Sequence, residues 1–174
     1  MSFLALIGTP TLLIALWQYL QRGSVHWADA MRWGMGLGFL FTGTDHFLNA
    51  IDRYVPMIPP PLNAYALQWV WATGVAELLG ALGLLLPSKA WATLGLPNLR
   101  PAAGIGLSVL LVCVVWANVH VAVQGQSFKG LEFGPLYYWI RPLFQPVFVV
   151  WALYASGAIG KSPAIPTRTA DETL

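Results

Sequence analysis

The sequence predicts an all-α fold, a polytopic transmembrane helical bundle. Two observations lead to this prediction. First, 57% of the 174 residues are hydrophobic and only 9% are charged, with a mean hydropathy of +0.62. Soluble domains carry about 25% charged residues, so this composition cannot cover a water-exposed surface. Second, the apolar residues gather into five segments, and a helix of about 20 residues crosses the hydrocarbon layer.

The bundle is expected to form one domain over residues 1–160, followed by a flexible polar tail at 161–174. The predicted helices lie at about residues 2–20, 27–49, 64–86, 101–124 and 136–160. The first segment lacks the basic region and cleavage site of a signal peptide, so it is expected to stay as a membrane helix. Pro10 should kink it, and Trp17 and Tyr19 end it where an aromatic belt belongs.

The second predicted helix carries small residues at four-residue spacing and ends in a histidine. The stripe consists of Gly34, Gly38, Thr42 and His46. Such stripes let helices approach closely in lipid. A proline-rich reversal follows, and the third helix then places Glu77 on one face with small and apolar residues, namely Val70, Thr73, Gly74, Gly80, Ala81 and Leu84. This face is expected to turn inward.

Polar residues also mark the last two predicted helices. Asn118 and His120 are two residues apart and therefore point in nearly opposite directions. We expect Asn118 to face the bundle and His120 to lie at an interface or partner surface. Arg141 and Gln145 are four residues apart and share one face of the last helix. Cys113, the only cysteine, is expected to be a small buried hydrophobe.

The distribution of basic residues predicts an orientation. Six lie on one side of the predicted crossings: Arg22, Arg32, Lys89, Arg100, Lys161 and Arg168. Three lie on the other: Arg53, Lys129 and Arg141. The positive-inside rule then places the N-terminus outside and the C-terminus in the cytoplasm. The proline-rich loop would lie towards the outer face, together with Asp45, His46, Asn118, Glu132 and Arg141.

Ionisable residues inside a membrane are expensive to keep there and are candidates for function by default. His46 and Glu77 are therefore the catalytic candidates. His46 can shuttle a proton near neutral pH. Glu77 can relay a proton, anchor a ligand, or pair with Arg141 or His46. The alternative for both is a purely structural role in helix packing. The candidate ligand-binding residues are Asn118, Arg141, Gln145, Trp71 and Met57. Arg141 can clamp a carboxylate, a phosphate or a quinone carbonyl, or it can simply snorkel to the interface.

Several functions are disfavoured. A net charge of +2 with scattered basic residues does not suggest nucleic-acid binding. Three histidines without a matched set of carboxylates do not predict a metal site. A transporter is disfavoured because the segments show no inverted repeat.

Five short stretches resemble the DoxX-like family of small bacterial integral membrane proteins. The most specific is TGVAELLGALGLLLP at 73–87; the others are HF at 46–47, MIPP at 57–60, AN at 117–118 and RPLFQ at 141–145. Together they extend over about residues 28–151. The sequence departs from the family pattern at Trp116, where relatives often have proline, and in its additional apolar segment before the usual four helices.

The resemblance implies a four-helix DoxX-like core plus one extra N-terminal transmembrane helix, in the bacterial inner membrane. Relatives include a subunit of a thiosulfate:quinone oxidoreductase and members of oxidant-defence complexes, while a distant relative assembles receptor channels. It also implies that His46, Glu77, Asn118 and Arg141 form one polar cluster.

Two functions are therefore expected. The first is a membrane subunit associated with redox metabolism, which binds a quinone or another lipophilic ligand in a pocket in the outer half of the membrane. If this subunit is an enzyme, we expect it to be a quinone-linked oxidoreductase subunit. The alternative is a non-catalytic accessory subunit or assembly factor, held to a larger complex by its small-residue and aromatic faces. Membrane lipids, other membrane subunits or a second copy are the expected partners.

Overall fold

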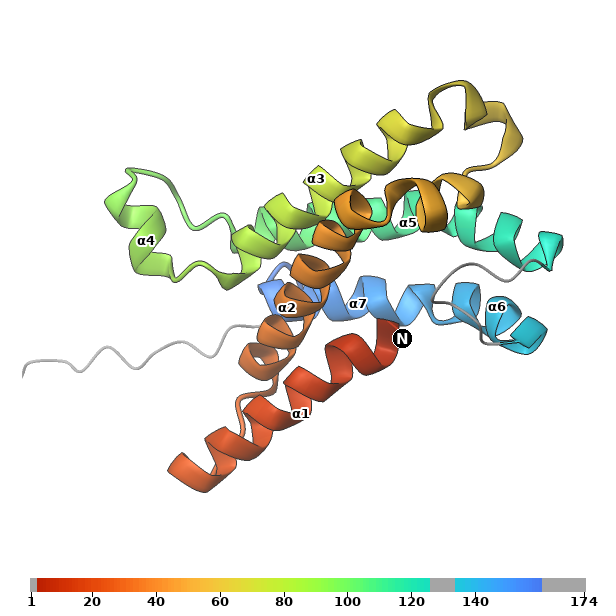
Figure 1. The fold of residues 1–174 in the computed structure, drawn as a ribbon. Coiled ribbons are helices and arrows are strands. Elements are labelled where there is room, and N and C mark those ends of the chain that lie inside the picture. Colours follow the sequence, from red (N-terminus) through yellow and green to blue (C-terminus); the bar gives the residue numbers. More distant parts are fainter. Residues whose placement is uncertain (1–2, 126–133, 161–174) are drawn as a thin grey trace, which may run out of the picture.

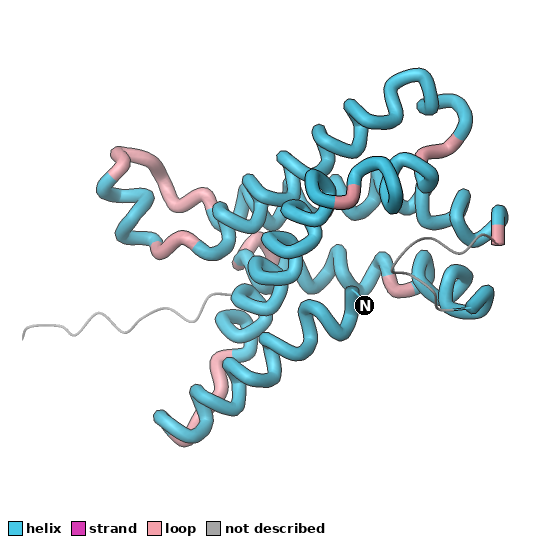
Figure 2. The backbone as a smooth tube through the Cα atoms, viewed as in Figure 1, coloured by secondary structure: helices cyan, strands magenta, loops and turns pink. Residues whose placement is uncertain are grey.

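A computed structural model describes residues 3–125 and 134–160 of the chain. These ranges contain helices and no strand (Figures 1 and 2), which confirms the predicted all-α class. The elements are α1 (Phe3–Arg22), α2 (Trp27–Leu48), η1 (Ala50–Tyr54), η2 (Val55–Met57), η3 (Pro60–Tyr65), α3 (Ala66–Leu85), α4 (Ser88–Thr93), α5 (Arg100–Gln124), α6 (Gly134–Leu143) and α7 (Gln145–Ser156). The predicted tail at 161–174, Lys129 and Glu132 lie outside the described residues.

Helix α2 is the centre of the bundle, because α1, α3 and α7 all pack against it (Figure 1). Helix α5 packs against α3 and α7 and completes the arrangement. The main apolar core draws side chains from each of these helices: Ile7, Met35, Phe39, Ala81, Leu84, Leu107, Leu111, Phe148 and Ala152. A helix covered on several sides by protein does not need an apolar surface of its own, which explains how α2 accommodates charged residues.

The first two residues of the small-residue stripe of α2, Gly34 and Gly38, face α1. A methyl group added at Gly34 would lie 1.9 Å from Thr11 Oγ1 and 2.4 Å from the Ile7 carbonyl oxygen. One added at Gly38 would lie 2.5 Å from the Ile7 side chain. The expectation that this stripe is a surface for a partner subunit is therefore wrong at Gly34 and Gly38, because the first helix of the same chain packs there.

The predicted inward face of α3 is confirmed. Its buried residues include Val70, Gly74, Gly80, Ala81 and Leu84, and the Glu77 side chain is only 12% exposed. Gly74 packs against His46 of α2 and Gly80 against Leu107 of α5, the two long helices that pack on α3.

Two arginines hold the C-terminal end of α3. Arg32 of α2 donates to the Leu84 carbonyl at 2.8 Å, and Arg100 of α5 donates to the Leu86 carbonyl at 3.0 and 3.1 Å. The last carbonyls of a helix have no partner within the helix and carry partial negative charge. Arg32 is also paired with Asp29, so its charge is compensated although it is buried.

The last predicted segment is two helices rather than one. Helix α6 ends at Leu143 and α7 runs only from Gln145 to Ser156. Pro142 and Pro146 flank the break, and each lacks the N–H that an intact helix would use there. Gly157, with φ of +75°, then ends α7. Cys113 also differs from the prediction, because it is exposed on the outer side of α5.

Three helical stretches are long and apolar enough to cross a membrane: Phe3–Arg22, Pro60–Leu85 and Arg100–Gln124. Large apolar side chains on these helices are exposed, among them Leu12, Leu13, Leu79, Val109 and Val112. Exposed apolar surface on this scale fits contact with membrane lipid. The chain is therefore a membrane protein.

Candidate ligand-binding site

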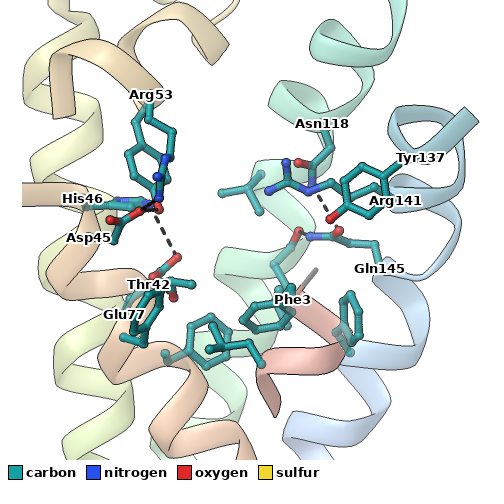
Figure 3. A pocket seen from close by; sticks show the side chains of 17 residues that line it. Phe3, Thr42, Asp45, His46, Arg53, Glu77, Asn118, Tyr137, Arg141 and Gln145 are labelled. Atoms are coloured by element: carbon teal, nitrogen blue, oxygen red, sulfur yellow. Dashed lines mark hydrogen bonds and ion pairs between the residues drawn. The ribbon is translucent and has the colours of Figure 1, made fainter. Parts of the chain in front are cut away.

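A cavity of about 270 Å³ lies between α2, α3, α5 and the α6–α7 pair. We call it the polar pocket. One wall carries Thr42, Asp45, His46, Arg53, Tyr54 and Glu77, and the opposite wall carries Asn118, Tyr137, Arg141 and Gln145 (Figure 3). The remaining lining is apolar and consists of Phe3, Leu6, Phe39, Phe41, Leu111, Val114 and Phe148.

Glu77 is the acidic centre of the first wall. Its Oε2 accepts a hydrogen bond of 2.5 Å from the Thr42 hydroxyl, which is also 3.2 Å from the Gly38 carbonyl. This arrangement suits both protonation states of the acid. When Glu77 is ionised, the Thr42 hydroxyl donates to its carboxylate. When Glu77 is protonated, its hydroxyl can donate to Thr42 Oγ1, and the Thr42 hydroxyl then donates to the Gly38 carbonyl.

His46 lies beside Glu77 with a defined tautomer. Its Nδ1 is 3.0 Å from the Val70 carbonyl, which can only accept, so Nδ1 carries a hydrogen in the neutral ring. Nε2 is then an acceptor, and it faces Glu77 Oε1 at 3.9 Å. A movement of about 1 Å would bring these two atoms to hydrogen-bond distance. The ring also packs against Tyr54, with centroids 3.9 Å apart.

Asp45 organises the rim of the same wall. This buried carboxylate pairs with Arg53, accepts from the Tyr54 hydroxyl at 2.8 Å, and accepts from the Asn49 side chain at 2.5 Å. Burial, followed by the hydrogen bond to Asp45, raises the pKa of the Tyr54 phenol above its ordinary value. Tyr54 therefore remains a neutral donor at physiological pH. The π-helical turn η1 places Arg53 and Tyr54 over Asp45.

The second wall is a chain of amides ending at an arginine. Asn118 donates to Gln145 Oε1 at 3.1 Å, and Gln145 donates to the Leu111 carbonyl at 2.8 Å. Arg141 points into the pocket beside them (Figure 3). Its Nη1 atom is buried and has no hydrogen-bond partner within the described residues. A buried donor without a partner is costly, so this atom is placed to donate to a ligand bound in the pocket.

Glu77 and Arg141 face each other across the pocket instead of touching. Among the ion pairs of the described ranges, Glu77 is matched with His46 and not with Arg141. The open question of which partner Glu77 meets is thereby answered in favour of His46. The space between the acidic wall and the guanidinium is consequently available for a polar group.

Aromatic rings supply much of the apolar lining. Phe3 packs against Phe39 with ring centroids 5.3 Å apart and edge-on against Phe148 at 5.0 Å. Phe3 is in the first turn of α1, so the N-terminal helix contributes to the pocket directly. A flat apolar group between the polar walls would meet these rings.

The predicted site residues divide into two groups. His46, Glu77, Asn118, Arg141 and Gln145 all line the polar pocket. Two predicted ligand-binding residues do not, and the structure corrects them. Trp71 is 46% exposed on the outer side of α3, whereas Met57 is buried in a separate apolar cluster with Val121, Ala122 and Tyr138.

Sequence reasoning missed the roles of several pocket residues. Asp45 was expected near His46 and Arg141, but its pairing with Arg53 was not, although Asp45, Asn49 and Arg53 follow one another at four-residue spacing. Thr42 was noticed only as a small residue, although it also precedes His46 by one turn. Nothing in the local sequence marks Phe3 or Tyr137, because their positions depend on tertiary packing.

Within residues 3–125 and 134–160, no group of three or more His, Cys, Asp or Glu side chains is arranged to hold a metal ion. His120, one of the histidines considered, is half-buried on α5 and does not line the polar pocket.

One family model matches residues 35–156 and is described as a domain of unknown function, DUF8561. The match covers more than two thirds of the chain. The chain belongs to this family. No curated protein and no solved structure matches it. The DUF8561 match begins inside α2, so α1 lies outside it, although Phe3 and Leu6 of α1 line the polar pocket.

Proposed function

We propose that this chain is a DoxX-like subunit of a bacterial inner-membrane redox complex and that its polar pocket binds the head group of a quinone. The observation that carries the proposal is the placement of Arg141, with its unpartnered buried Nη1, across the pocket from the Glu77–His46 pair. The proposal also draws on the DoxX-like stretches of the sequence, because HF, TGVAELLGALGLLLP, AN and RPLFQ contribute five of the pocket residues.

A quinone head group suits this pocket because it is a flat ring with acceptors on opposite edges. Arg141 can donate to one carbonyl oxygen, and protonated Glu77 can donate to the other. The rings of Phe3, Phe39 and Phe148 offer apolar surface to the faces of the quinone ring. A cavity of about 270 Å³ is near the lower end of the size range of small-molecule sites, which fits a single ring.

Proton exchange is the chemical role that the proposal gives to this chain. Reduction of a quinone to a quinol adds two electrons and two protons, one proton to each oxygen. Glu77 can deliver one proton to the oxygen that it faces, and the His46 imidazolium can then return a proton to Glu77 from Nε2, while Thr42 satisfies either form of the acid. The neutral His46 ring takes up its next proton from water. Arg141 stabilises the charge on the other oxygen, which takes the second proton from water. The electrons are assigned to a redox centre in a partner subunit.

The proposal includes a topology. Helices α1, α2, α3, α5 and the α6–α7 pair each cross the inner membrane, with the N-terminus outside and the C-terminus in the cytoplasm. Helices α2, α3, α5 and α6–α7 are the four-helix DoxX-like core, and α1 is the additional helix. The central position of α2 supports its inclusion, because protein rather than lipid covers its polar residues.

Quinone binding tests the proposal through Arg141. In lipid nanodiscs, the wild type is expected to bind a benzoquinone saturably, and Arg141→Gln to weaken the affinity by about 10- to 100-fold, the usual value of a charged hydrogen bond. Arg22→Gln removes the same charge from an exposed site at the end of α1 and should bind like the wild type. Absence of saturable binding by the wild type would contradict the proposal.

Glu77→Gln distinguishes a redox role from an accessory role. The glutamine can still accept from Thr42, so the thermal midpoint should remain near that of the wild type. In membranes where the variant replaces the wild type, quinone turnover by the complex should fall by about 100-fold or more, the usual contribution of a positioned acid or base. Asp52→Asn, an exposed carboxylate outside the pocket, should have no such effect. Unchanged turnover with Glu77→Gln would favour the accessory role.

A further inference from the structure

A second, smaller cavity of about 160 Å³ adjoins the polar pocket. We call it the side pocket. It shares Phe3, Tyr137, Arg141 and Phe148 with the polar pocket, so the two cavities adjoin at these side chains. Unlike the polar pocket, the side pocket has no acidic or amide residue in its lining.

The side pocket opens onto the apolar outer surface of the bundle. Its remaining lining residues are Leu4 of α1, Ile140 of α6 and Phe144, which are 39%, 37% and 38% exposed. Helix α1 packs along α2 and reaches α7 through the contact between Phe3 and Phe148. The opening therefore lies between the first turn of α1 and α6, on a surface that faces lipid in a membrane.

From this arrangement we infer that the side pocket holds the hydrocarbon chain of a ligand whose polar head group occupies the polar pocket. The ligand is then a long-chain amphiphile that reaches its site laterally from the bilayer, passing between α1 and α6. This inference rests on the proposed function, which it makes more specific by defining the class of quinone as one with an apolar tail.

The rim of the polar pocket and the side pocket differ in their chemistry. On the first wall, Asp45, Arg53 and Tyr54 form a hydrogen-bonded rim. A hydrocarbon chain laid across that rim would remove solvent from polar groups without replacing their interactions, which is unfavourable. The side pocket instead offers aliphatic and aromatic contacts along its whole length.

Arg141 links the two cavities. Its guanidinium group belongs to the polar pocket, and its aliphatic stem can lie along apolar surface in the manner usual for arginine. A head group that accepts a hydrogen bond from Arg141 would thus have its chain placed at the mouth of the side pocket. Leu4 and Phe3 lie outside the DUF8561 match at 35–156, so α1 supplies one side of this passage.

The test compares two benzoquinones with the same head group, one bearing a decyl chain and one a methyl group, both measured in lipid nanodiscs. Leu4→Trp and, from the opposite side, Ile140→Trp enlarge side chains that line the side pocket. Each is expected to weaken binding of the decyl compound by about tenfold or more, as overpacking of a filled site does. Binding of the methyl compound should stay within about twofold. Leu12→Trp, on the outer face of α1 and 63% exposed, should alter neither affinity.

Each outcome has a distinct meaning. Selective loss of the decyl compound supports the inference, and retained binding of the methyl compound shows that the variants are folded. If both variants leave the decyl affinity unchanged, or lower both affinities equally, the side pocket does not hold the chain, while the proposed function stands. If the wild type binds neither compound, the proposed function fails and the inference fails with it.

Discussion

Gly34→Ala is expected to lower the free energy of unfolding by about 1–3 kcal/mol, the usual effect of overpacking a close contact. The added methyl group would lie 1.9 Å from Thr11 Oγ1 and 2.4 Å from the Ile7 carbonyl oxygen. The Thr11 side chain can rotate, but the carbonyl belongs to the backbone of α1, so the helix itself must move. Because Phe3 is in the same helix, binding in the polar pocket should weaken as well.

Thermal unfolding in detergent, followed by circular dichroism, measures the effect of Gly34→Ala. The matched control is Gly8→Ala, in α1, where a new methyl group has no neighbour within 4 Å and should change stability by less than about 1 kcal/mol in the favourable direction. Thr11→Ala combined with Gly34→Ala should recover only part of the loss, since the Ile7 carbonyl remains. A wild-type midpoint for Gly34→Ala would show that α1 does not pack on this stripe.

Asp45→Ala is expected to lower the free energy of unfolding by about 2–4 kcal/mol, because it leaves a partly buried cation and two hydrogen-bond donors without their acceptor. The cation is Arg53, whose side chain is 22% exposed, and the donors are Asn49 and Tyr54. The turn η1 should detach from the pocket rim as a result.

Hydrogen–deuterium exchange locates the effect of Asp45→Ala. Faster exchange should be confined to residues 49–57 and the end of α2, with α5 and α7 protected as in the wild type. Ile51→Ala, in the same turn and 69% exposed, is the control and should exchange like the wild type. Uniformly faster exchange through the whole bundle would mean that Asp45 supports the global fold and not the rim alone.

The helical architecture could be predicted from the sequence, because long apolar segments of membrane-spanning length are expected to form helices. The inward face of α3 could also be predicted, since Gly74, Gly80 and Ala81 share a face with Glu77 and small residues mark close helix contacts. The same argument identified the stripe on α2 but not its partner. Periodicity shows that Gly34 and Gly38 meet another helix, and it does not show which one.

A pocket residue could be predicted from the sequence when it is an isolated polar residue in an otherwise apolar helix. Glu77, Asn118 and Arg141 are conspicuous for this reason, and the structure brings them to one cavity. Trp71 failed as a prediction because tryptophan is common at membrane interfaces whether or not a ligand is near. Met57 failed because its neighbour in space, Tyr138, is far away in the sequence.

The break between α6 and α7 at Phe144 could not be predicted from the sequence for a different reason. Pro142 and Pro146 are visible in the sequence, but a proline in a membrane helix can produce either a kink or a break. The outcome depends on whether neighbouring groups satisfy the freed carbonyls. Here Phe144 and Phe148 still donate to the carbonyls of Ile140 and Phe144, at 3.3 and 3.2 Å, so helical hydrogen bonds remain on both sides of the break.

Native mass spectrometry of the protein, gently extracted from its own membrane, tests the central claim most directly. The claim is that the polar pocket holds the head group of a lipophilic ligand at Arg141. The expected result is a stoichiometric complex of the wild type with a molecule of quinone mass, and loss of that molecule from Arg141→Gln but not from Arg22→Gln. A wild type that carries no small molecule and is instead bound to a cofactor-free membrane assembly would contradict the claim.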